Sequence, residues 1–477
     1  MEISFDGGKE EEEAEELLLT SLPVEVILHV LSYVGAADLC SFGATNNTLR
    51  SVSSDETLWK GLFLRNFSLL SFACSSSSSC FSSSSSSSKA EIEKDGLLMR
   101  GTTNEGRWKW RDLFMRRCRT RKNWREGNWA LKASLSVGSP VYAVRFDDHK
   151  VVAGLQNSAI KVLHKYSGQT LLQLDGHGDW IGAVQYDDEK VVSCSGDHSV
   201  RVWNWDGKCV YRTRKHTGWV KRLQYTQELL ATGSGDSTVK LWRWSPGWKY
   251  MPKDSEEHNE QDDTCDDGEL QENAKERSSL LPTTKRDEPL PIPKCVRTLA
   301  GHQQGIMGLQ FDRNTLVSSS LRGNIRVWDI ESGKCLHEIN APSELRCVAF
   351  DENDIVAGDR IGHVTVWDRA TGELKCSLDG HTGYVKFVHI DATKIVSGGG
   401  DGAIKVWDRK VIPTASTNDA EGEFSPHYLY SIAAHERDII NMDIHEDEVF
   451  TASTDSSMKL YSFLHNENSP SYEAMTT

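Results

Sequence analysis

The sequence predicts an α+β multidomain chain, with a short all-α region followed by a long all-β region. Residues 17–67 carry helix start and stop signals, and from about residue 129 the chain changes to short β-branched runs separated by Gly and Asp turns. A seven-residue pattern then recurs about every 40 residues. The 477 residues are 38% hydrophobic and 26% charged, which is ordinary globular composition for more than one domain.

The net charge of −15 comes from two segments. Residues 1–16, which we expect to form a disordered acidic leader, contribute −7, and residues 250–293 contribute −8. The rest of the chain is neutral in total, so the overall charge does not identify a partner.

Membrane and export signals are absent from the sequence. No apolar run approaches the roughly 20 residues that span a bilayer, and the N-terminus is acidic where a secretory signal is basic. The eleven cysteines stand singly, without the CxxC spacing of zinc or redox sites. We therefore expect a soluble protein, cytoplasmic and/or nuclear, with no bound metal and no cofactor.

Residues 17–67 are predicted to form short helices. Pro23 suits a first helical position, Gly35 ends that helix, Asp38 can cap the next, and the segment from Asp55 makes a last one. Residues 68–105 contain thirteen serines between positions 71 and 88, a composition that cannot bury a core, so we expect a disordered linker.

Residues 106–127 are predicted to form a basic connector helix. Its sequence RWKWRDLFMRRCRTRKNWR (107–125) holds nine basic residues and one acidic residue. Such a run is typical either of a nuclear import or phosphate-binding patch or of an amphipathic helix with its arginines in solvent. We favour the second interpretation, with Trp108, Leu113 and Phe114 facing inward.

The all-β region is an internal repeat of seven copies. They are NSAIKVL (157–163), DHSVRVW (197–203), DSTVKLW (236–242), RGNIRVW (322–328), IGHVTVW (361–367), DGAIKVW (401–407) and DSSMKLY (455–461). Their last residues lie 40, 39, 86, 39, 40 and 54 positions apart, so the two long gaps are one period plus an insertion. This pattern predicts a seven-bladed β-propeller over residues 128–465, with a disordered acidic insertion at 245–294, a shorter one at 411–428, and a tail at 466–477.

The copies resemble the WD-repeat family through their Gly-His and Trp-Asp pairs, such as Gly380-His381 and Trp407-Asp408. The resemblance implies a hydrogen-bonded tetrad inside a blade, formed by a His, a Ser or Thr, a turn Asp and a Trp. The implied sets are His177, Ser193, Asp197 and Trp203; His216, Thr232, Asp236 and Trp242; His381, Ser397, Asp401 and Trp407; and, with Tyr in place of Trp, His435, Thr451, Asp455 and Tyr461. Copies 1, 4 and 5 have Asn157, Arg322 and Ile361 at the turn Asp position, so we expect those blades to be weaker or differently used.

Ser, His and Asp together could also indicate nucleophilic catalysis. Their recurrence at the repeat period favours a structural role, because a catalytic site is needed once and a blade needs its own hydrogen bonds each time. We therefore expect no catalytic residues. Residues 129–137 resemble the segments that lead into later copies, and in WD propellers the strand before the first repeat completes the last blade, so this strand is expected to close the ring.

The sequence LPVEVILHVLSYVGAADLCSF (22–42), followed by DETLWKGLF (55–63), resembles the F-box. Together with the connector helix and the repeats, it makes the chain similar to the F-box/WD-repeat family over nearly its whole length. The resemblance implies that the helices bind a Skp-type adaptor, and through it a cullin, by Leu22, Pro23, Ile27, Val30, Leu31, Leu39, Leu58 and Trp59. The alternative is a helix that packs only on its own neighbours.

In this family the substrate usually binds the narrow face of the propeller, around the central channel. Aligning the copies gives the candidate residues Tyr142, Trp180, Trp219, Lys221, Arg322, Arg346, Arg360, Tyr384 and Lys386. Cations interleaved with aromatics favour an acidic or phosphorylated peptide. The alternative is that loop tips are charged anyway and the aromatics brace the turns. The triple-arginine set of the family's phosphodegron readers is incomplete, because four of the seven turn positions carry Gly or Leu.

Three functions therefore follow from the sequence. The favoured one is a non-catalytic, substrate-recognition subunit of a Skp–cullin–F-box ubiquitin ligase that selects a target protein. One alternative is a WD-repeat scaffold whose helices bind a different partner. The other is a nucleic-acid binder that uses the basic helix and the aromatic face, and its binding would depend steeply on salt; we do not favour nucleic acid as a partner.

Overall fold

The structure is a computed structural model that describes residues 55–66, 110–245, 262–263, 280–282, 290–411 and 428–464. The predicted leader (1–16), most of the F-box segment (17–67), the Ser-rich linker (68–105) and the tail (466–477) lie outside the described residues. The chain divides into two compact units, one of residues 1–74 and 102–122 and one of residues 75–101 and 123–477. Each unit is described by itself below.

The first unit contains α5 (Glu56–Asn66) and most of α8 (Trp110–Glu126). The carboxylate of Asp55 caps α5, because it accepts a hydrogen bond from the backbone N–H of Thr57 at 2.7 Å. Leu58, Trp59 and Leu62 on α5 are buried, as is Phe114 on α8. The rings of Trp59 and Phe114 lie 5.6 Å apart, so the two helices share a small aromatic core.

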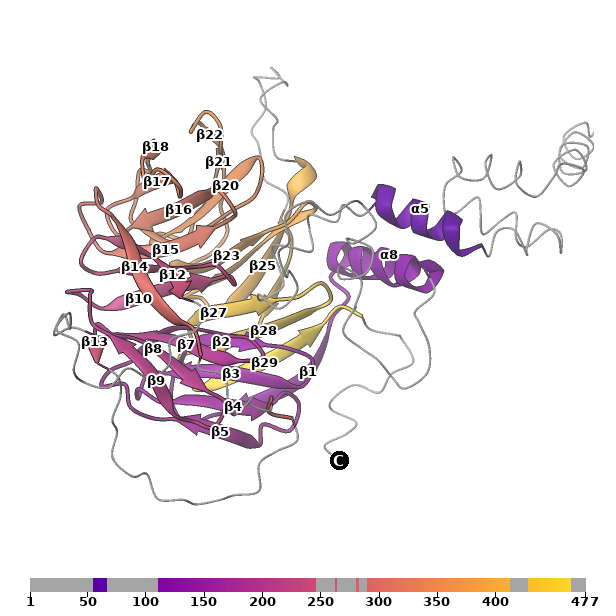
Figure 1. Ribbon diagram of the computed structural model, residues 1–477. Helices are drawn as coiled ribbons and strands as arrows, with labels where there is room; N and C mark the ends of the chain where they lie inside the picture. The colour runs from indigo at the N-terminus through magenta and orange to yellow at the C-terminus, as the bar shows by residue number, and fades with distance from the viewer. Residues whose placement is uncertain are drawn as a thin grey trace, which may run out of the picture. The chain divides into compact units, whose positions relative to one another are not determined.

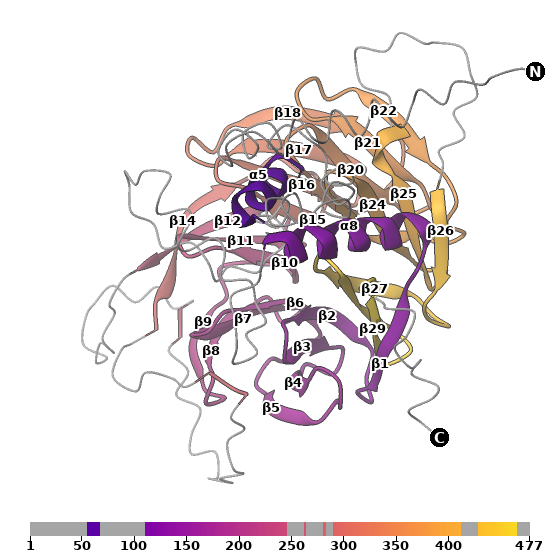
Figure 2. The same cartoon turned by 90° about the vertical axis from the view of Figure 1, so that its right-hand side faces the viewer.

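The second unit is a ring of seven antiparallel sheets, the blades (Figures 1 and 2). Blades 1 to 3 contain β2 (Val141–Phe146), β3 (Lys150–Leu155), β4 (Ile160–His164) and β5 (Thr170–Leu174); β6 (Ile181–Tyr186), β7 (Lys190–Ser195), β8 (Val200–Asn204) and β9 (Cys209–Thr213); and β10 (Val220–Tyr225), β11 (Leu229–Ser234), β12 (Val239–Ser245) and β14 (Ile292–Leu299). The short β13 (Asp262–Asp263) pairs with the outer edge of β9.

Blades 4 to 6 follow the same order from the channel outward. They contain β15 (Ile306–Phe311), β16 (Thr315–Ser320), β17 (Asn324–Asp329) and β18 (Cys335–Asn340); β19 (Leu345–Phe350), β20 (Asp354–Asp359), β21 (Val364–Asp368) and β22 (Leu374–Leu378); and β23 (Val385–Ile390), β24 (Lys394–Gly399), β25 (Ala403–Asp408), the 3₁₀ turn η1 (Arg409–Val411) and β26 (Tyr428–Ala433). Blade 7 contains β27 (Ile439–Ile444), β28 (Glu448–Ser453), β29 (Ser457–Ser462) and β1 (Ala130–Ser136). The predicted seven-bladed propeller is confirmed.

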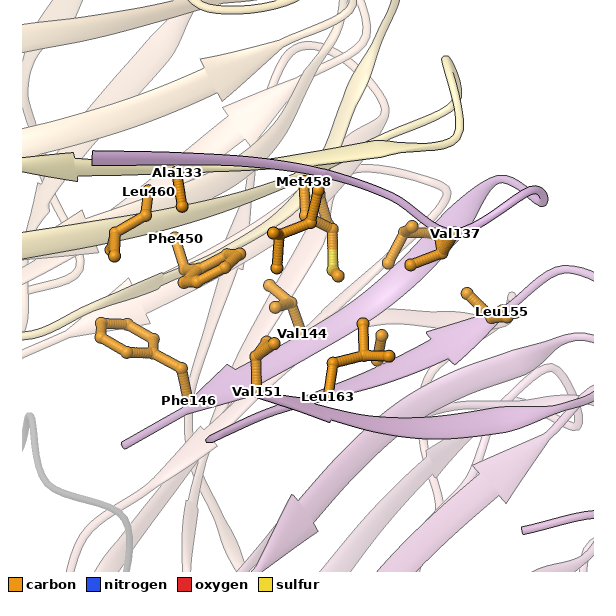
Figure 3. Close-up of a cluster of buried hydrophobic side chains, with 14 of the residues drawn as sticks. Ala133, Val137, Val144, Phe146, Val151, Leu155, Leu163, Phe450, Met458 and Leu460 are labelled. Atoms are coloured by element: carbon orange, nitrogen blue, oxygen red, sulfur yellow. The ribbon is translucent and has the colours of Figure 1, made fainter. Parts of the chain in front are cut away.

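The ring closes through β1, as predicted. β1 runs antiparallel to β29, with Ala130 opposite Ser462 and Ser136 opposite Ser457, so a strand from before the first repeat is the outer strand of the last blade. Figure 3 shows the core of this junction, where Phe450 and Leu460 of blade 7 face Val144 and Phe146 of blade 1. The first and last blades of the propeller are therefore held together by a sheet and by a shared apolar core.

The insertion predicted at 245–294 differs from the structure at its ends and in its middle. β12 continues to Ser245 and β14 begins at Ile292, so both predicted ends fall inside strands of blade 3. Leu281 is 6% exposed and packs in the apolar cluster between blades 1 and 2. The insertion thus contributes an apolar side chain to the core, which its acidic composition did not indicate. The shorter predicted insertion ends where β26 begins, at Tyr428.

The last turn of α8 belongs to the propeller unit. The Asn123 side-chain amide donates to the carbonyl of Phe463 at 2.7 Å, and the indole N–H of Trp124 donates to the carbonyl of Glu446 at 3.0 Å. The Trp124 ring stacks on the Phe463 ring, with 3.6 Å between their centroids. The ammonium of Lys394 lies 4.4 Å from the centroid of the Trp124 ring. The end of the connector helix is therefore anchored where blade 6 meets blade 7.

Within the described residues, no helix has the length and apolar character needed to cross a membrane.

Candidate functional site

The tetrad of blade 2 has the predicted geometry. Trp203 donates its indole N–H to the Ser193 hydroxyl at 2.8 Å, and that hydroxyl lies 2.8 Å from Nε2 of His177. Nδ1 of His177 lies 3.0 Å from the Asp197 carboxylate, which also accepts from two backbone N–H groups. Burial lowers the pKa of His177, so the ring is neutral and donates from Nδ1. The network satisfies buried polar groups inside the blade.

Blades 3, 6 and 7 repeat this network. The His Nδ1 to Asp distances are 2.7 Å for His216, 2.9 Å for His381 and 2.8 Å for His435. Blade 7 differs in its fourth member, because the hydroxyl of Tyr461 donates to the carbonyl of Ala434 at 3.3 Å instead of meeting the tetrad Thr.

Blade 4 keeps three tetrad members and loses the fourth. Nε2 of His302 lies 2.7 Å from the Ser318 hydroxyl, which accepts from Trp328 at 2.9 Å. Arg322 occupies the turn position and donates to the side chain of Gln303 at 2.9 Å, so no carboxylate meets Nδ1 of His302. Burial, followed by the nearby Arg326, lowers the pKa of His302 to about 4.

Blade 5 has a different network. The aligned turn residue is Ile361, and Asp359 lies two positions before it. Asp359 accepts from the backbone N–H of Ile361 at 3.0 Å and of Gly362 at 2.9 Å, and from the hydroxyl of Ser343 at 2.5 Å. The carboxylate that is missing from the aligned turn position is therefore replaced from the end of β20, which frees the turn residues to face outward. In blade 1, the Asn157 side chain only accepts from the backbone of Ala159, at 3.4 Å.

The predicted substrate residues come from equivalent positions of the blades. Tyr142, Lys221, Arg346 and Lys386 are each the second residue of an innermost strand, at one mouth of the channel; Trp180, Trp219 and Tyr384 each directly precede such a strand. The innermost strands of neighbouring blades pack against each other around the whole ring. Side chains that are far apart in sequence therefore gather on one face, which we call the narrow face.

The aromatic residues on blades 1 to 3 form a continuous row. The rings of Tyr142 and Trp180 lie 6.0 Å apart, and those of Trp180 and Trp219 lie 6.4 Å apart. A Cβ on Gly235 would lie 2.4 Å from the Trp219 ring, so the glycine allows the indole to lie close over the turn. Tyr384 stands apart on blade 6, where its hydroxyl donates to Asp438 at 2.8 Å.

The cationic residues lie mainly on blades 4 to 6. Glu344 lies between two of them, 3.4 Å from Arg346 and 3.3 Å from Arg360. A cavity of about 580 Å³ opens beside this group and is lined by Gln304, Leu321, Arg322, Pro342, Ser343, Glu344 and Arg346. The buried Nε of Arg346 has no hydrogen-bond partner among the described residues.

Lys221 and Lys386 extend the cationic region into the channel. Lys386 is paired with Asp438 at 2.8 Å. The Lys221 ammonium donates to the Met307 sulfur at 3.7 Å. Burial, followed by the neighbouring Arg222, Arg346 and Lys386, lowers the pKa of Lys221 well below the usual range. The predicted residues Lys221, Arg346 and Lys386 are therefore close enough to affect one another.

Leu58 and Trp59, which are predicted to bind an adaptor, are 4% and 1% exposed and pack in the core of the helical unit. Their role in adaptor binding stays a prediction. The other six adaptor residues lie outside the described residues. The alignment also missed Arg222, Glu344 and Asp438. Glu344 and Asp438 form ion pairs with the predicted cations, and Arg222 directly follows the predicted Lys221. The repeat pattern identifies neither kind of position.

No group of three or more His, Cys, Asp or Glu side chains in the described part of the chain is arranged to hold a metal ion.

Family models match both regions of the chain. The F-box-like model matches residues 19–65, and the model of the WD domain, G-beta repeat matches residues 168–204, 207–243, 293–329 and 372–408. Each WD match runs from the outer strand of one blade through the third strand of the next. The matched copies are those of blades 2, 3, 4 and 6, in which the His, the Ser or Thr, and the Trp are all present.

Several curated proteins are similar over parts of their length. Cell division control protein 4 of Saccharomyces cerevisiae is 24% identical over 334 residues, which is 69% of this chain and 38% of that protein. WD repeat-containing protein pop1 of Schizosaccharomyces pombe is 23% identical over 338 residues, 67% of this chain and 40% of that protein. Mitochondrial division protein 1 of Mycosarcoma maydis is 33% identical over 193 residues, 39% of this chain and 20% of that protein. The chain thus spans two fifths or less of the length of these relatives.

Proposed function

We propose that this chain, which contains an F-box-like segment and WD repeats, is the substrate-recognition subunit of a Skp–cullin–F-box ubiquitin ligase. The observation that carries the proposal is the joining of an F-box-like segment at 19–65 to a closed seven-bladed propeller in one chain. The first would bind a Skp-type adaptor and through it a cullin. The second would hold a target protein, while catalysis is left to other subunits.

Adaptor binding is assigned to the F-box-like segment that precedes α5 in the sequence. Leu22, Pro23, Ile27, Val30, Leu31 and Leu39 are the residues that the F-box resemblance indicates. The described part of the unit supports a role for α5 as the base of this segment, because Leu58 and Trp59 are already buried in its own core. A unit of about 50 residues has a thin core, and burial of its remaining apolar residues against a partner would stabilise it.

Target binding is assigned to the narrow face. The aromatic row of Tyr142, Trp180 and Trp219 offers flat apolar contact on one side. On the other side Arg322 and Arg346 line a cavity, and Arg360 pairs with Glu344 of its lining. A peptide with an acidic or phosphorylated residue beside an apolar one matches this division, since guanidinium groups form paired hydrogen bonds with carboxylate and phosphate oxygens. The single cysteines favour a reducing compartment, cytosolic or nuclear.

The proposal is tested with a purified Skp-type adaptor. We expect the double variant Leu22→Ala with Pro23→Ala to lose adaptor binding in a pull-down, while its propeller melts at the same temperature as that of the wild type. The matched control is Arg346→Ala with Arg360→Ala, which changes the propeller face and should bind adaptor normally. Wild-type protein that does not bind the adaptor, or a Leu22/Pro23 variant that binds it unchanged, would overturn the F-box assignment.

A further inference from the structure

Two arginines face each other across the outer strands of blade 2. Arg201 on β8 lies directly opposite Arg212 on β9. Arg201 is 4% exposed, and Nε of each arginine is buried without a hydrogen-bond partner. Among the described residues, neither guanidinium pairs with a carboxylate. Like charges directly opposite each other destabilise an antiparallel pair, so this edge of the blade lacks a counter-charge.

Blade 4 shows how the same position is neutralised elsewhere. Arg326 on β17 corresponds to Arg201, since both stand two residues before the tetrad Trp. It lies opposite Glu338 on β18 and forms an ion pair with that residue at 2.7 Å. In the other five blades the facing residue of the outer strand is uncharged: Gln173, Thr298, Ser377, Ser431 and Ser134. Blade 2 alone has a second cation there.

The acidic insertion brings acids to this edge. β13 runs antiparallel to β9 (Figure 1), with Asp263 opposite Arg212 and Asp262 opposite Thr213. Arg201, Arg212 and Asp263 therefore occupy one row across three strands. Residues 208–215 hold four basic residues and no acidic one, whereas residues 250–293 carry a net charge of −8. The edge and the added strand are thus complementary in charge.

A second described part of the insertion contacts the same region. Leu281 is 6% exposed and packs in an apolar cluster that also contains Trp205 of blade 2, Leu172 on β5 and Cys209 on β9. An apolar side chain buried in this way holds its segment against the blade. Both described parts of the insertion therefore lie against blade 2, one through its backbone and one through a buried side chain.

We propose that the outer edge of blade 2 is a docking site for an extended acidic segment, and that the chain's own acidic insertion occupies it. The segment binds by adding a strand to β9, with Asp263 as the counter-charge of the two arginines and Leu281 as an apolar anchor. The added strand also covers an edge that could otherwise pair with another chain. The inference does not rest on the proposed ligase function, because it needs neither adaptor nor target.

Thermal unfolding tests the counter-charge. A chain that lacks residues 250–279 keeps Leu281 and should melt about 1–3 °C below the wild type, because the arginine pair loses its acid. Arg212→Glu gives blade 2 the charge pair of blade 4 and should restore the melting temperature of the shortened chain. The matched control is Lys208→Glu, at an exposed lysine directly before β9, which should restore nothing. Equal melting of the wild type and the shortened chain, or equal recovery with the control, would overturn the proposal.

A separate peptide tests the docking itself. A fluorescent peptide of residues 256–272 should bind the shortened chain, and should bind the wild type about tenfold more weakly because the tethered segment already occupies the edge. The control peptide has Gln261 and Thr264 replaced by Pro, which keeps every acid but prevents strand pairing, so it should not bind. Equal binding of the two peptides would mean that charge alone attracts them, and equal affinity for both proteins would mean an empty edge; either result contradicts the proposal.

Hydrogen exchange of the intact wild type decides the question if the shortened chain does not fold. β5 is the outer strand of blade 1, and in the described part of the chain no strand lies beyond it. Backbone amides of β9 should therefore exchange more slowly than those of β5, because β13 covers the edge of β9. Equal exchange in the two strands would show that nothing is docked there.

Discussion

Blades 2 and 4 are built alike and differ at one turn position. Each contains a His, a Ser and a Trp in one hydrogen-bonded chain, and the His to Ser distance is 2.8 Å in blade 2 and 2.7 Å in blade 4. Blade 2 continues the chain with Asp197, which accepts from the His and from the turn backbone. Blade 4 has Arg322 there, and this side chain lines the cavity on the narrow face. The same turn position therefore forms hydrogen bonds inside blade 2 and lines a surface cavity in blade 4.

The difference identifies blades in which the turn position contributes a side chain to the surface instead of an acceptor for hydrogen bonds inside the blade. Blades 2 and 3 keep full tetrads and carry Trp180 and Trp219 of the aromatic row, whereas blades 4 and 5 lack the aligned turn Asp and carry Arg322 and Arg360. Departures from the repeat rule that coincide with a cavity are typical of functional positions. We therefore interpret the loss of the turn Asp as part of the target-binding surface.

The largest expected effect is the loss of the turn Asp where it is used. Asp197→Ala removes the acceptor for His177, Gly178 and Ser199 and should lower the free energy of unfolding by about 2–4 kcal/mol, because several buried donors lose their partner. Arg322→Ala, at the same position of blade 4, should cost less than about 0.5 kcal/mol. Urea unfolding of both variants measures the contrast, and equal losses would mean that the two positions do not differ.

A second effect is expected at acidic pH. The pKa of His302 is about 4 in the fold and about 6.5 in an unfolded chain, so the unfolded state binds more protons between these values. Its contribution to stability is complete above pH 6.5 and is lost as the pH falls toward 4, by about 2 kcal/mol at pH 5. Unfolding curves of the wild type and His302→Gln at pH 7 and pH 5 test this. The variant should lose less stability than the wild type, and equal losses would exclude His302 as a cause.

Blade 4 can be given the turn residue of blade 2 by the substitution of Arg322 with Asp. Arg322→Asp places a carboxylate where His302 lacks one, and should raise the free energy of unfolding by about 1 kcal/mol at pH 7. It should also weaken target capture, because it replaces a cation at the cavity with an anion. Denaturant titration and a capture assay on the same sample measure the two effects. If the variant is no more stable than the wild type and captures the target equally well, residue 322 contributes neither to stability nor to target capture.

The repeat pattern predicted most of the propeller, for identifiable reasons. The His, Ser or Thr, Asp and Trp of a blade lie at fixed spacings, so their contacts follow from the alignment, as does the closing strand β1. The burial of Leu281 could not be predicted, because the adjacent pair Leu280 and Leu281 inside an acidic insertion shows no periodicity. Glu344 and Arg222 were missed for another reason: their roles depend on neighbours from other blades, which only the closed ring brings together.

We propose that the cationic side of the narrow face holds the target, and target capture and ubiquitination by the assembled ligase test this assignment. Arg346→Ala with Arg360→Ala should reduce target capture, by about 1.5–3 kcal/mol for each charge-assisted hydrogen bond lost, with less than additive effects since both arginines lie beside Glu344. Glu344→Ala, which releases both arginines, should leave capture intact or strengthen it. Both variants should bind adaptor and melt like the wild type. A double arginine variant that captures and ubiquitinates its target at the normal rate would place recognition elsewhere on the propeller.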